Sequence, residues 1–204
     1  MSVRRLVPSQ AAAYRALMLD AYTLHPEAYT SSAEERGALP LSWWESRLAE
    51  DQRPAELVLG AFHAGELAGV AGLSFEAREK ARHKATLFGL YVRPESRHLG
   101  LGRQLVEAAL AQAGARPAVR LVQLTVTQGN DDAHRLYARH GFVDFGLEPL
   151  AVAVGGGFVA KIHMWCPLRP GDGDLSRIGA AVPHDDAAGM RRTAHQTSHP
   201  EREK

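Results

Sequence analysis

The segment LYVRPESRHLGLGRQL, residues 90–105, restricts the fold more than any other part of the sequence. It reads as the end of a β-strand, a turn at Pro94 and a glycine-containing loop that opens an amphipathic helix. The helical period continues to Gly114, which is placed to end the helix. Because Gly100 and Gly102 carry no side chains, backbone N–H groups at the helix N-terminus are open to an anion such as a pyrophosphate.

Two common phosphate-binding motifs do not fit this loop. A Walker loop requires Gly-Lys-Ser/Thr at its end, whereas Arg-Gln-Leu follows Gly102. The dinucleotide fingerprint requires a third glycine, and this chain has Leu105 at that position. The loop therefore predicts an anion site that is neither a P-loop nor a dinucleotide fingerprint.

The chain as a whole alternates strands and helices. Strands are predicted at residues 3–7, 56–63, 66–76, 83–92, 119–127, 142–154 and 158–166, and helices at 11–24, 43–50, 101–114 and 131–140. Ser42 and Glu45 have the capping-box spacing for the helix at 43–50, and residues 25–40 are expected to form a long loop. This order predicts an α/β (α+β) fold with a mixed sheet and helices on both of its faces.

Composition and charge narrow the function classes. Of the 204 residues, 45% are apolar and 23% are charged, which excludes disordered, fibrous and membrane proteins. The formal net charge of +1 is far from the basic excess typical of nonspecific nucleic-acid binding. Cys166 is the single cysteine, so it cannot form an internal disulfide, and no Cys-His pattern marks it as a nucleophile. The N-terminus lacks the apolar core of a signal peptide, and we expect a cytoplasmic protein with no membrane or nucleic-acid partner.

We expect one folded domain at residues 1–168 and a flexible C-terminal tail at 169–204. The tail is rich in Gly, Pro, Asp, Arg and His and has few large apolar residues. His195 and His199 in the tail have i,i+4 spacing, but neither a helical pattern nor a third ligand accompanies them. No metal site is therefore expected.

Two motifs resemble those of the GNAT N-acetyltransferase superfamily. The first is Tyr-Val-Arg-Pro at residues 91–94 followed by the loop at 97–102, which is similar to the family's Arg/Gln-x-x-Gly-x-Gly/Ala loop after a strand. The second spans residues 130–142 and follows the family pattern N-x-x-A-x-x-L-Y-x-x-x-G-F. The resemblance covers roughly residues 3–167 and is strongest over 84–143.

The resemblance implies a GNAT-type fold and acetyl-CoA, or another acyl-CoA, as cosubstrate. The sheet would have six to seven mostly antiparallel strands with splayed central strands, and Gly89 fits a bulge that opens them. The residues expected to bind the cofactor lie on the strand end, the loop and the second motif: Leu90, Tyr91, Val92, Arg97, His98, Leu99, Gly100, Leu101, Gly102, Arg103 and Asn130. Asn130 either caps its helix alone or also reaches the cofactor.

By the same resemblance, Tyr137 stands at the position of the catalytic acid. Direct transfer from a thioester to an amine needs a proton for the departing thiolate. A phenol, with a reference pKa of about 10, can protonate a thiolate whose conjugate acid has a pKa near 8.5. The alternative for Tyr137 is a core tyrosine that packs on the sheet.

The position of the general base departs from the family pattern. Many members carry a glutamate on the strand before the loop, whereas this chain has Thr86, which cannot act as a base near neutral pH. Glu76 and His83 are candidates that act through a water molecule, and His63 and His163 are more distant ones. Each is otherwise a surface or strand residue, and loss of the amine proton to bulk solvent also stays open.

The acceptor implied by the resemblance is a small-molecule or peptide amine of unidentified structure. Trp43 and Trp44 are expected to be one core and one rim aromatic, or part of a lid of which at least one contacts the substrate. Four acids near the presumed entrance favour a cationic amine unless they are only solvated charges: Glu27, Glu34, Glu35 and Glu45.

Two function classes therefore stay open. The first is an acyl-CoA dependent N-acyltransferase that acetylates a primary amine by direct attack in a ternary complex. The second is a noncatalytic acyl-CoA binding or sensing module, which Thr86 favours and Tyr137 opposes. Homodimerisation through the last strands is expected by resemblance alone.

Overall fold

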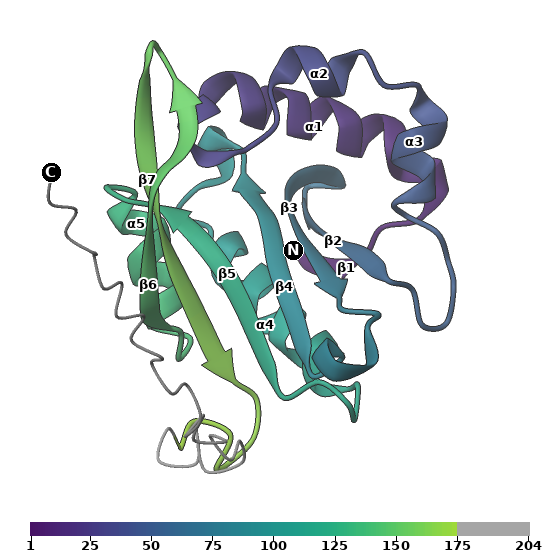
Figure 1. The fold of residues 1–204 in the computed structure, drawn as a ribbon. Helices are drawn as coiled ribbons and strands as arrows, with labels where there is room; N and C mark the ends of the chain where they lie inside the picture. The colour runs from purple at the N-terminus through teal and green to yellow at the C-terminus, as the bar shows by residue number, and fades with distance from the viewer. Residues whose placement is uncertain (175–204) are drawn as a thin grey trace, which may run out of the picture. The chain divides into compact units, whose positions relative to one another are not determined.

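The computed structural model describes residues 1–174 and contains a seven-stranded sheet (Figure 1). Its strands are β1 (Ser2–Arg5), β2 (Glu56–His63), β3 (Glu66–Phe75), β4 (Lys84–Val92), β5 (Leu121–Thr127), β6 (Val143–Val154) and β7 (Gly157–Pro167), in the spatial order β1-β2-β3-β4-β5-β7-β6. The helices are α1 (Ala11–Leu24), α2 (Ala33–Gly37), α3 (Leu41–Ser46), α4 (Leu101–Gly114) and α5 (Asp131–Ala138). β4 and β5 run parallel and the other neighbouring pairs are antiparallel, so the predicted mixed, mostly antiparallel fold class is confirmed.

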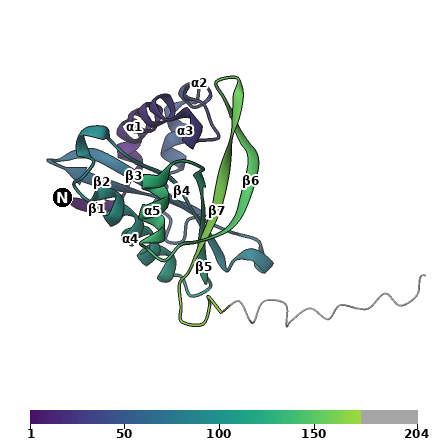
Figure 2. The same ribbon diagram turned by 90° about the vertical axis from the view of Figure 1, so that its left-hand side faces the viewer.

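Helices cover both faces of the sheet, as the element order predicts. On one face, Leu105 and Val106 of α4 are fully buried in a cluster that includes Leu73 of β3. On the opposite face, Leu17 of α1 packs in a second cluster that includes Val70 of β3. Figure 2 shows α1 and α4 on opposite sides of the sheet. The two cores fix the orientation of β4, the strand that leads into the glycine loop.

The sheet opens between β4 and β5. The two strands pair only from Lys84–Leu121 to Thr86–Gln123, and Figure 1 shows them diverging beyond that point. The pairing of β3 with β4 shifts register between Val70 and Gly72, so two β4 residues lie opposite one β3 residue. Gly89 lies in this bulge with φ +62°, a conformation that glycine adopts without strain. The expected bulge at Gly89 and the splayed central strands are confirmed.

The bulge also changes which face of the sheet the odd- and even-numbered side chains of β4 point to. Before it, Leu87 belongs to the core under α4, whereas after it Tyr91 belongs to the core under α1. Leu90 and Val92 pack against the α4 core instead. Side chains of β4 therefore reach the α1 side at even positions before the bulge, as at Thr86 and Phe88, and both of these line the cavity described below.

The helical caps between α1 and β2 differ from the prediction. Residues 25–40 contain α2 rather than only a loop, and its N-cap is Ser32, whose hydroxyl accepts from the Glu35 N–H while the Glu35 carboxylate accepts from the Ser32 N–H. The predicted capping box at Ser42 is wrong, because α3 begins earlier, with Pro40 as its N-cap. Proline has its φ preset near the helical value and so favours a helix start at this point.

The predicted tail is only partly described. In residues 169–174, Asp172 forms a salt bridge with Arg120, the residue before β5. Residues 175–204, which include the histidine pair at His195 and His199, lie outside the described part of the chain. The boundary of the domain at residue 168 thus stays a prediction.

Candidate active site

The loop before α4 presents a run of free backbone donors. The Arg97 N–H donates to the Pro94 carbonyl, and within residues 1–174 the next N–H with a backbone partner is that of Gln104, which donates to the Gly100 carbonyl. His98 and Gly100 adopt left-handed conformations, with φ +67° and +74°. Alternation of left- and right-handed residues turns successive N–H groups toward one point, as in anion-binding nests. The N–H groups of residues 98–103 are therefore free to bind an anion at the N-terminus of α4.

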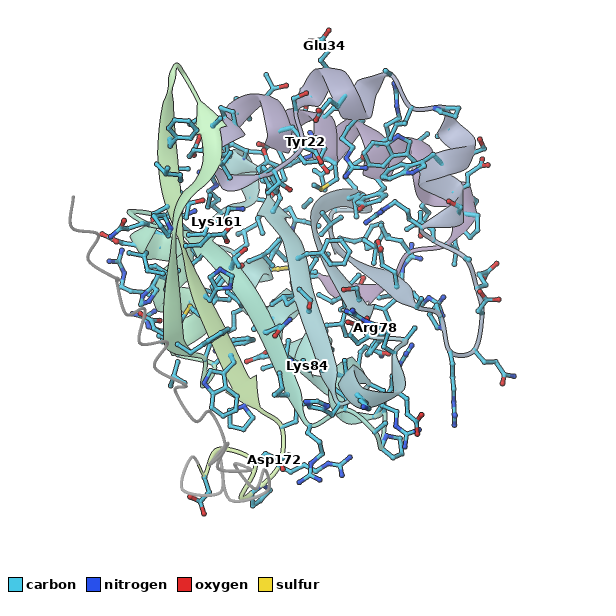
Figure 3. All side chains as sticks on the ribbon, viewed as in Figure 1. Tyr22, Glu34, Arg78, Lys84, Lys161 and Asp172 are labelled. Atoms are coloured by element: carbon cyan, nitrogen blue, oxygen red, sulfur yellow. The ribbon has the colours of Figure 1, made fainter. Side chains whose placement is uncertain are left out.

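A cavity of about 410 Å³ lies on the α1 side of the opened sheet. Its lining comes from α1, the 25–47 segment, β4, β5, α5 and β7, so residues far apart in the sequence meet there. Figure 3 shows two of the lining side chains, Tyr22 of α1 and Lys161 of β7, in the part of the molecule next to the helices. Leu90, Asn130 and Tyr137 line this cavity, as does His163, one of the more distant candidate bases.

Tyr137 lies where the cavity reaches α5. The residue is only 7% exposed, its ring packs edge-on against Phe142, and burial raises its pKa well above the ordinary value for a phenol. The phenol is therefore protonated at neutral pH and holds a proton that it can donate.

Comparison with known proteins assigns the family. A family model described as the acetyltransferase (GNAT) family matches residues 16–142, more than half of the chain. The chain belongs to the GNAT acetyltransferase family. Members of this family use acetyl-CoA, and the resemblance inferred from the two motifs is confirmed.

Solved structures of GNAT proteins have the same fold. The acetyltransferase of the GNAT family from Streptococcus pneumoniae is 28% identical, with a TM-score of 0.72, over 81% of this chain and 98% of its own. The yncA protein from Salmonella typhimurium, crystallised with its cofactor acetyl-CoA, is 22% identical, with a TM-score of 0.67, over 83% and 95%. An N-acetyltransferase from Staphylococcus aureus is 19% identical, with a TM-score of 0.69, over 82% and 98%.

The two arginines of the GNAT loop make contacts of their own. Arg97 Nη2 lies 2.9 Å from His25 Nε2, and its Nε donates to the Val92 carbonyl. Arg103 Nε donates to the Glu107 carboxylate at 2.8 Å. Both side chains are exposed at the loop, so each can exchange a surface contact for a phosphate.

Asn130 caps α5. Its side-chain oxygen accepts from the Ala133 N–H at 3.2 Å, as the cap reading of this residue predicts. Asn130 and Ala133 both line the cavity. The amide N–H groups of Asn130 remain available to a ligand, so the cap and a cofactor contact are compatible.

Tyr29 is a site residue that the sequence reasoning missed. Its hydroxyl donates to the Leu90 carbonyl in the β4 bulge at 3.3 Å. Burial raises its pKa, and the charge of the Tyr137 hydroxyl adds to this effect; both tyrosines line the cavity. The only signal in the sequence was the length of the segment at 25–40, which is typical of functional loops.

The candidate bases lie in different places. Glu76 is paired with Arg78, which lowers the pKa of that carboxyl, and both residues border a second hollow, which shares only Thr86 and Gln123 with the lining of the cavity. His83 directly precedes β4, about 23 Å of extended strand from Leu90. Figure 3 shows Arg78 and Lys84 at the end of the sheet opposite to Tyr22 and Lys161. Glu76 and His83 are therefore not brought to the cavity.

His163 of β7 is the candidate base that lines the cavity. It pairs in register with Thr125, an exposed β5 residue that lines the same space. Its Nε2 lies 2.9 Å from the Glu148 carboxylate of β6, and its side chain is 34% exposed. A proton on Nε2 that is donated to Glu148 leaves Nδ1 as an acceptor. His63 does not line the cavity.

Thr86 and Gln123 lie at the point where the sheet opens. The Gln123 amide donates to the Thr86 hydroxyl at 3.3 Å, across the last paired residues of β4 and β5. Both residues line the cavity. Because Thr86 stands where many family members have a glutamate, the cavity lining carries no charge at the point where the sheet opens.

The charged lining of the cavity is basic. Glu27, Glu34, Glu35 and Glu45, the acids that favoured a cationic amine, do not line it. Arg36, Arg47 and Lys161 do. The tryptophan prediction of one core and one rim residue is confirmed, because Trp44 is 1% exposed whereas Trp43 is only partly buried; both line the cavity.

Other predicted features carry no chemistry at this site. Cys166 is buried, and burial raises the pKa of its thiol, as expected for a packed cysteine. Within the described part of the chain, no group of three His, Cys, Asp or Glu side chains is arranged to hold a metal ion. None of the helices in residues 1–174 is long and apolar enough to cross a membrane.

Proposed function

We propose that this protein transfers the acetyl group of acetyl-CoA to a primary amine by direct attack in a ternary complex. The observation that carries the proposal is the combination of three features on β4 and the elements next to it: the free N–H groups of residues 98–103, the gap between β4 and β5, and the cavity that Tyr137 lines. Acetyl-CoA supplies the activated acyl group as a thioester. The protein has to bind and orient the two substrates and to transfer protons.

The residues of the glycine loop fit a pyrophosphate. The N–H groups of His98, Leu99, Gly100, Leu101, Gly102 and Arg103 bind its oxygens, and Arg97 adds a charge-assisted hydrogen bond. The strand end at Leu90, Tyr91 and Val92, which has no β5 partner, offers backbone groups to the pantetheine amides. The thioester would then lie in the gap, within reach of Tyr137 in the cavity wall.

Two proton transfers complete the reaction. The amine nitrogen forms the amide bond, the C–S bond breaks, and Tyr137 gives its proton to the departing thiolate. The amine proton goes to His163, which Glu148 orients through the 2.9 Å contact. His163 takes the place of Glu76 and His83 in this role because it alone of the proposed bases lines the cavity.

His163→Ala is expected to lower kcat about tenfold, because water then has to accept the amine proton, and added imidazole is expected to restore part of the loss. The matched control is His134→Ala. His134 has the same 2.9 Å contact with a carboxylate, that of Asp144, and similar exposure, but does not line the cavity. Equal rates for the two variants, or no rescue by imidazole, would remove His163 from the mechanism.

The second candidate function is a noncatalytic acyl-CoA binding module. The observation in its favour is Thr86, which is bonded to Gln123 and supplies no base at the position of the family's glutamate. Such a module binds acetyl-CoA through the same loop and releases no thiol.

The decisive experiment measures thiol release from acetyl-CoA by the purified protein with a panel of polyamines, aminoglycosides, amino acids and peptides. Acetyl-CoA binding is measured beside it by calorimetry. Amine-dependent release identifies the enzyme and its acceptor class. Tight acetyl-CoA binding with no release from any amine favours the binding module, and absence of binding contradicts both functions.

The homodimer also remains a proposal. β6 is an edge strand of the sheet, and it exposes large apolar side chains, among them Leu147 and Leu150. An exposed apolar edge favours pairing with a second chain. Sedimentation analysis of the purified protein tests this, and a monomer at all concentrations would contradict it.

A further inference from the structure

The acceptor side of the cavity has an excess of positive charge. Arg36, Arg47 and Lys161 line it, and no Asp or Glu does so within the described residues. Arg36 and Arg47 both place their guanidinium carbon 4.7 Å from the centre of the Trp43 ring, so the two cations lie near each other. The charges of both also act on the Tyr22 hydroxyl, which lines the same wall.

Carboxylates beside the cavity balance only part of this charge. Glu56 forms a salt bridge with Arg47. Glu148 pairs with Lys161 across β6 and β7, and its carboxylate contacts His163. Arg36 forms no salt bridge within residues 1–174, although its charge acts on the Glu56 carboxyl and its guanidinium lies over the Trp43 ring. Lys161 is 7% exposed, and its ammonium donates to the Ala28 carbonyl at 3.3 Å. Arg36 is therefore the cation best placed to bind a ligand.

Aromatic rings form much of the remaining wall. Tyr22 and Tyr29 pack edge-on at 5.0 Å, and Trp43 and Trp44 do so at 5.1 Å. Phe88 lines the cavity beside the gap between β4 and β5, and the Arg47 guanidinium lies over its ring. Such walls bind apolar bodies, and a cavity of about 410 Å³ lies in the range of small-molecule sites.

We propose that the acceptor is a small amine that also carries an oxyanion, such as a carboxylate, on an apolar or aromatic body, and that Arg36 binds the oxyanion. A guanidinium matches an oxyanion with two parallel hydrogen bonds. The positive field disfavours an ammonium ion, so it favours the neutral, nucleophilic form of the amine. It also disfavours amines with several positive charges. This inference rests on the proposed acetyltransferase function and names the substrate class of the same site.

The test compares acceptors that differ in one charge. Thiol release is measured with L-phenylalanine and L-phenylalaninamide, with the corresponding pair of methionine, and with spermidine. The amine of a carboxamide is the weaker base and is less protonated at neutral pH, so intrinsic reactivity favours the carboxamides. We expect the carboxylates to have a kcat/KM about tenfold higher or more, the factor that one charge-assisted hydrogen bond contributes. The phosphonate analogue of phenylalanine shows whether the site prefers a different oxyanion.

Arg36→Gln is expected to lower kcat/KM for the carboxylates about tenfold through KM and to change kcat/KM for the carboxamides much less, so that the preference for carboxylates is lost. Arg36→Lys keeps the charge and is expected to keep part of the preference. Arg82→Gln is the matched control, because Arg82 is exposed and does not line the cavity. A thermal unfolding curve for each variant separates loss of folding from loss of binding.

The outcomes separate this proposal from the proposed function. Thiol release with spermidine or the carboxamides at rates equal to or above those of the carboxylates keeps the acetyltransferase and overturns the oxyanion acceptor. Unchanged preference in Arg36→Gln overturns the role of Arg36. If no amine gives thiol release, binding of the same probes to the CoA-bound protein is measured by calorimetry, which shows whether the oxyanion site exists. Arg36-dependent binding of a carboxylate or phosphonate supports the site even though catalysis fails, and no binding overturns it.

Discussion

Tyr137→Phe is expected to lower kcat for acetyl transfer by a factor of about 10² to 10⁴, the usual contribution of a positioned general acid. The side chain is buried against Phe142, and a phenylalanine ring fills the same space. Burial raises the pKa of Tyr137, which keeps its proton in place at neutral pH. A thiolate that departs into the same buried gap is also poorly solvated, so its basicity rises for the same reason and proton transfer to it is favoured.

The measurement separates chemistry from binding. Steady-state thiol release gives kcat, and calorimetry gives the dissociation constant for acetyl-CoA, which we expect to stay within about twofold of wild type because Tyr137 is proposed to act on the sulfur and not on the phosphates. Tyr29→Phe is the informative control, because its hydroxyl lies near that of Tyr137 and is bonded to the Leu90 carbonyl. A large loss of kcat in Tyr29→Phe and a small loss in Tyr137→Phe would transfer the acid role to Tyr29.

Local signals in the sequence predicted the elements and the cofactor loop. The strand and helix periods and the glycine positions depend on neighbouring residues, and the loop, the Gly89 bulge and the α5 cap at Asn130 lie where these signals put them. The cap of α3 was predicted wrongly because Ser42–Glu45 has the spacing of a capping box, although only Ser32–Glu35, before α2, forms one. Pro40 is the N-cap of α3, so this helix starts two residues earlier than predicted.

The lining of the cavity could not be read from one sequence. His163 and Lys161 come to the site because β7 pairs with β5 in the register Thr125–His163 and Thr127–Lys161. A shift of one residue would turn both side chains to the other face, and nothing in the local sequence fixes that register. The basic lining likewise depends on Arg36, which reaches the cavity only because the segment before α3 folds over it. The sequence therefore predicted the loop that we propose to bind the cofactor in more detail than the acceptor side of the cavity.

Gly100→Asp is expected to weaken acetyl-CoA binding about a hundredfold. Gly100 is the N-cap of α4 with φ +74°, and a Cβ atom built there meets no heavy atom within 4 Å. Aspartate is among the residues that tolerate this left-handed conformation, so the loop is expected to keep its shape. The new carboxylate would lie beside the N–H groups proposed to bind the pyrophosphate, where it repels the ligand's negative charge and competes for the same donors.

Gly100→Asn is the matched control, because asparagine has nearly the same shape and backbone preference as aspartate but no charge. We expect its dissociation constant for acetyl-CoA, measured by calorimetry, to rise only a few-fold. Salt screens repulsion between exposed charges, so the ratio between the two variants is expected to shrink as ionic strength rises. Affinities close to that of the wild type in both variants would place the pyrophosphate away from the N-terminus of α4. Equally large losses in both would mean that the glycine is required for the shape of the loop, and that charge at this position contributes little.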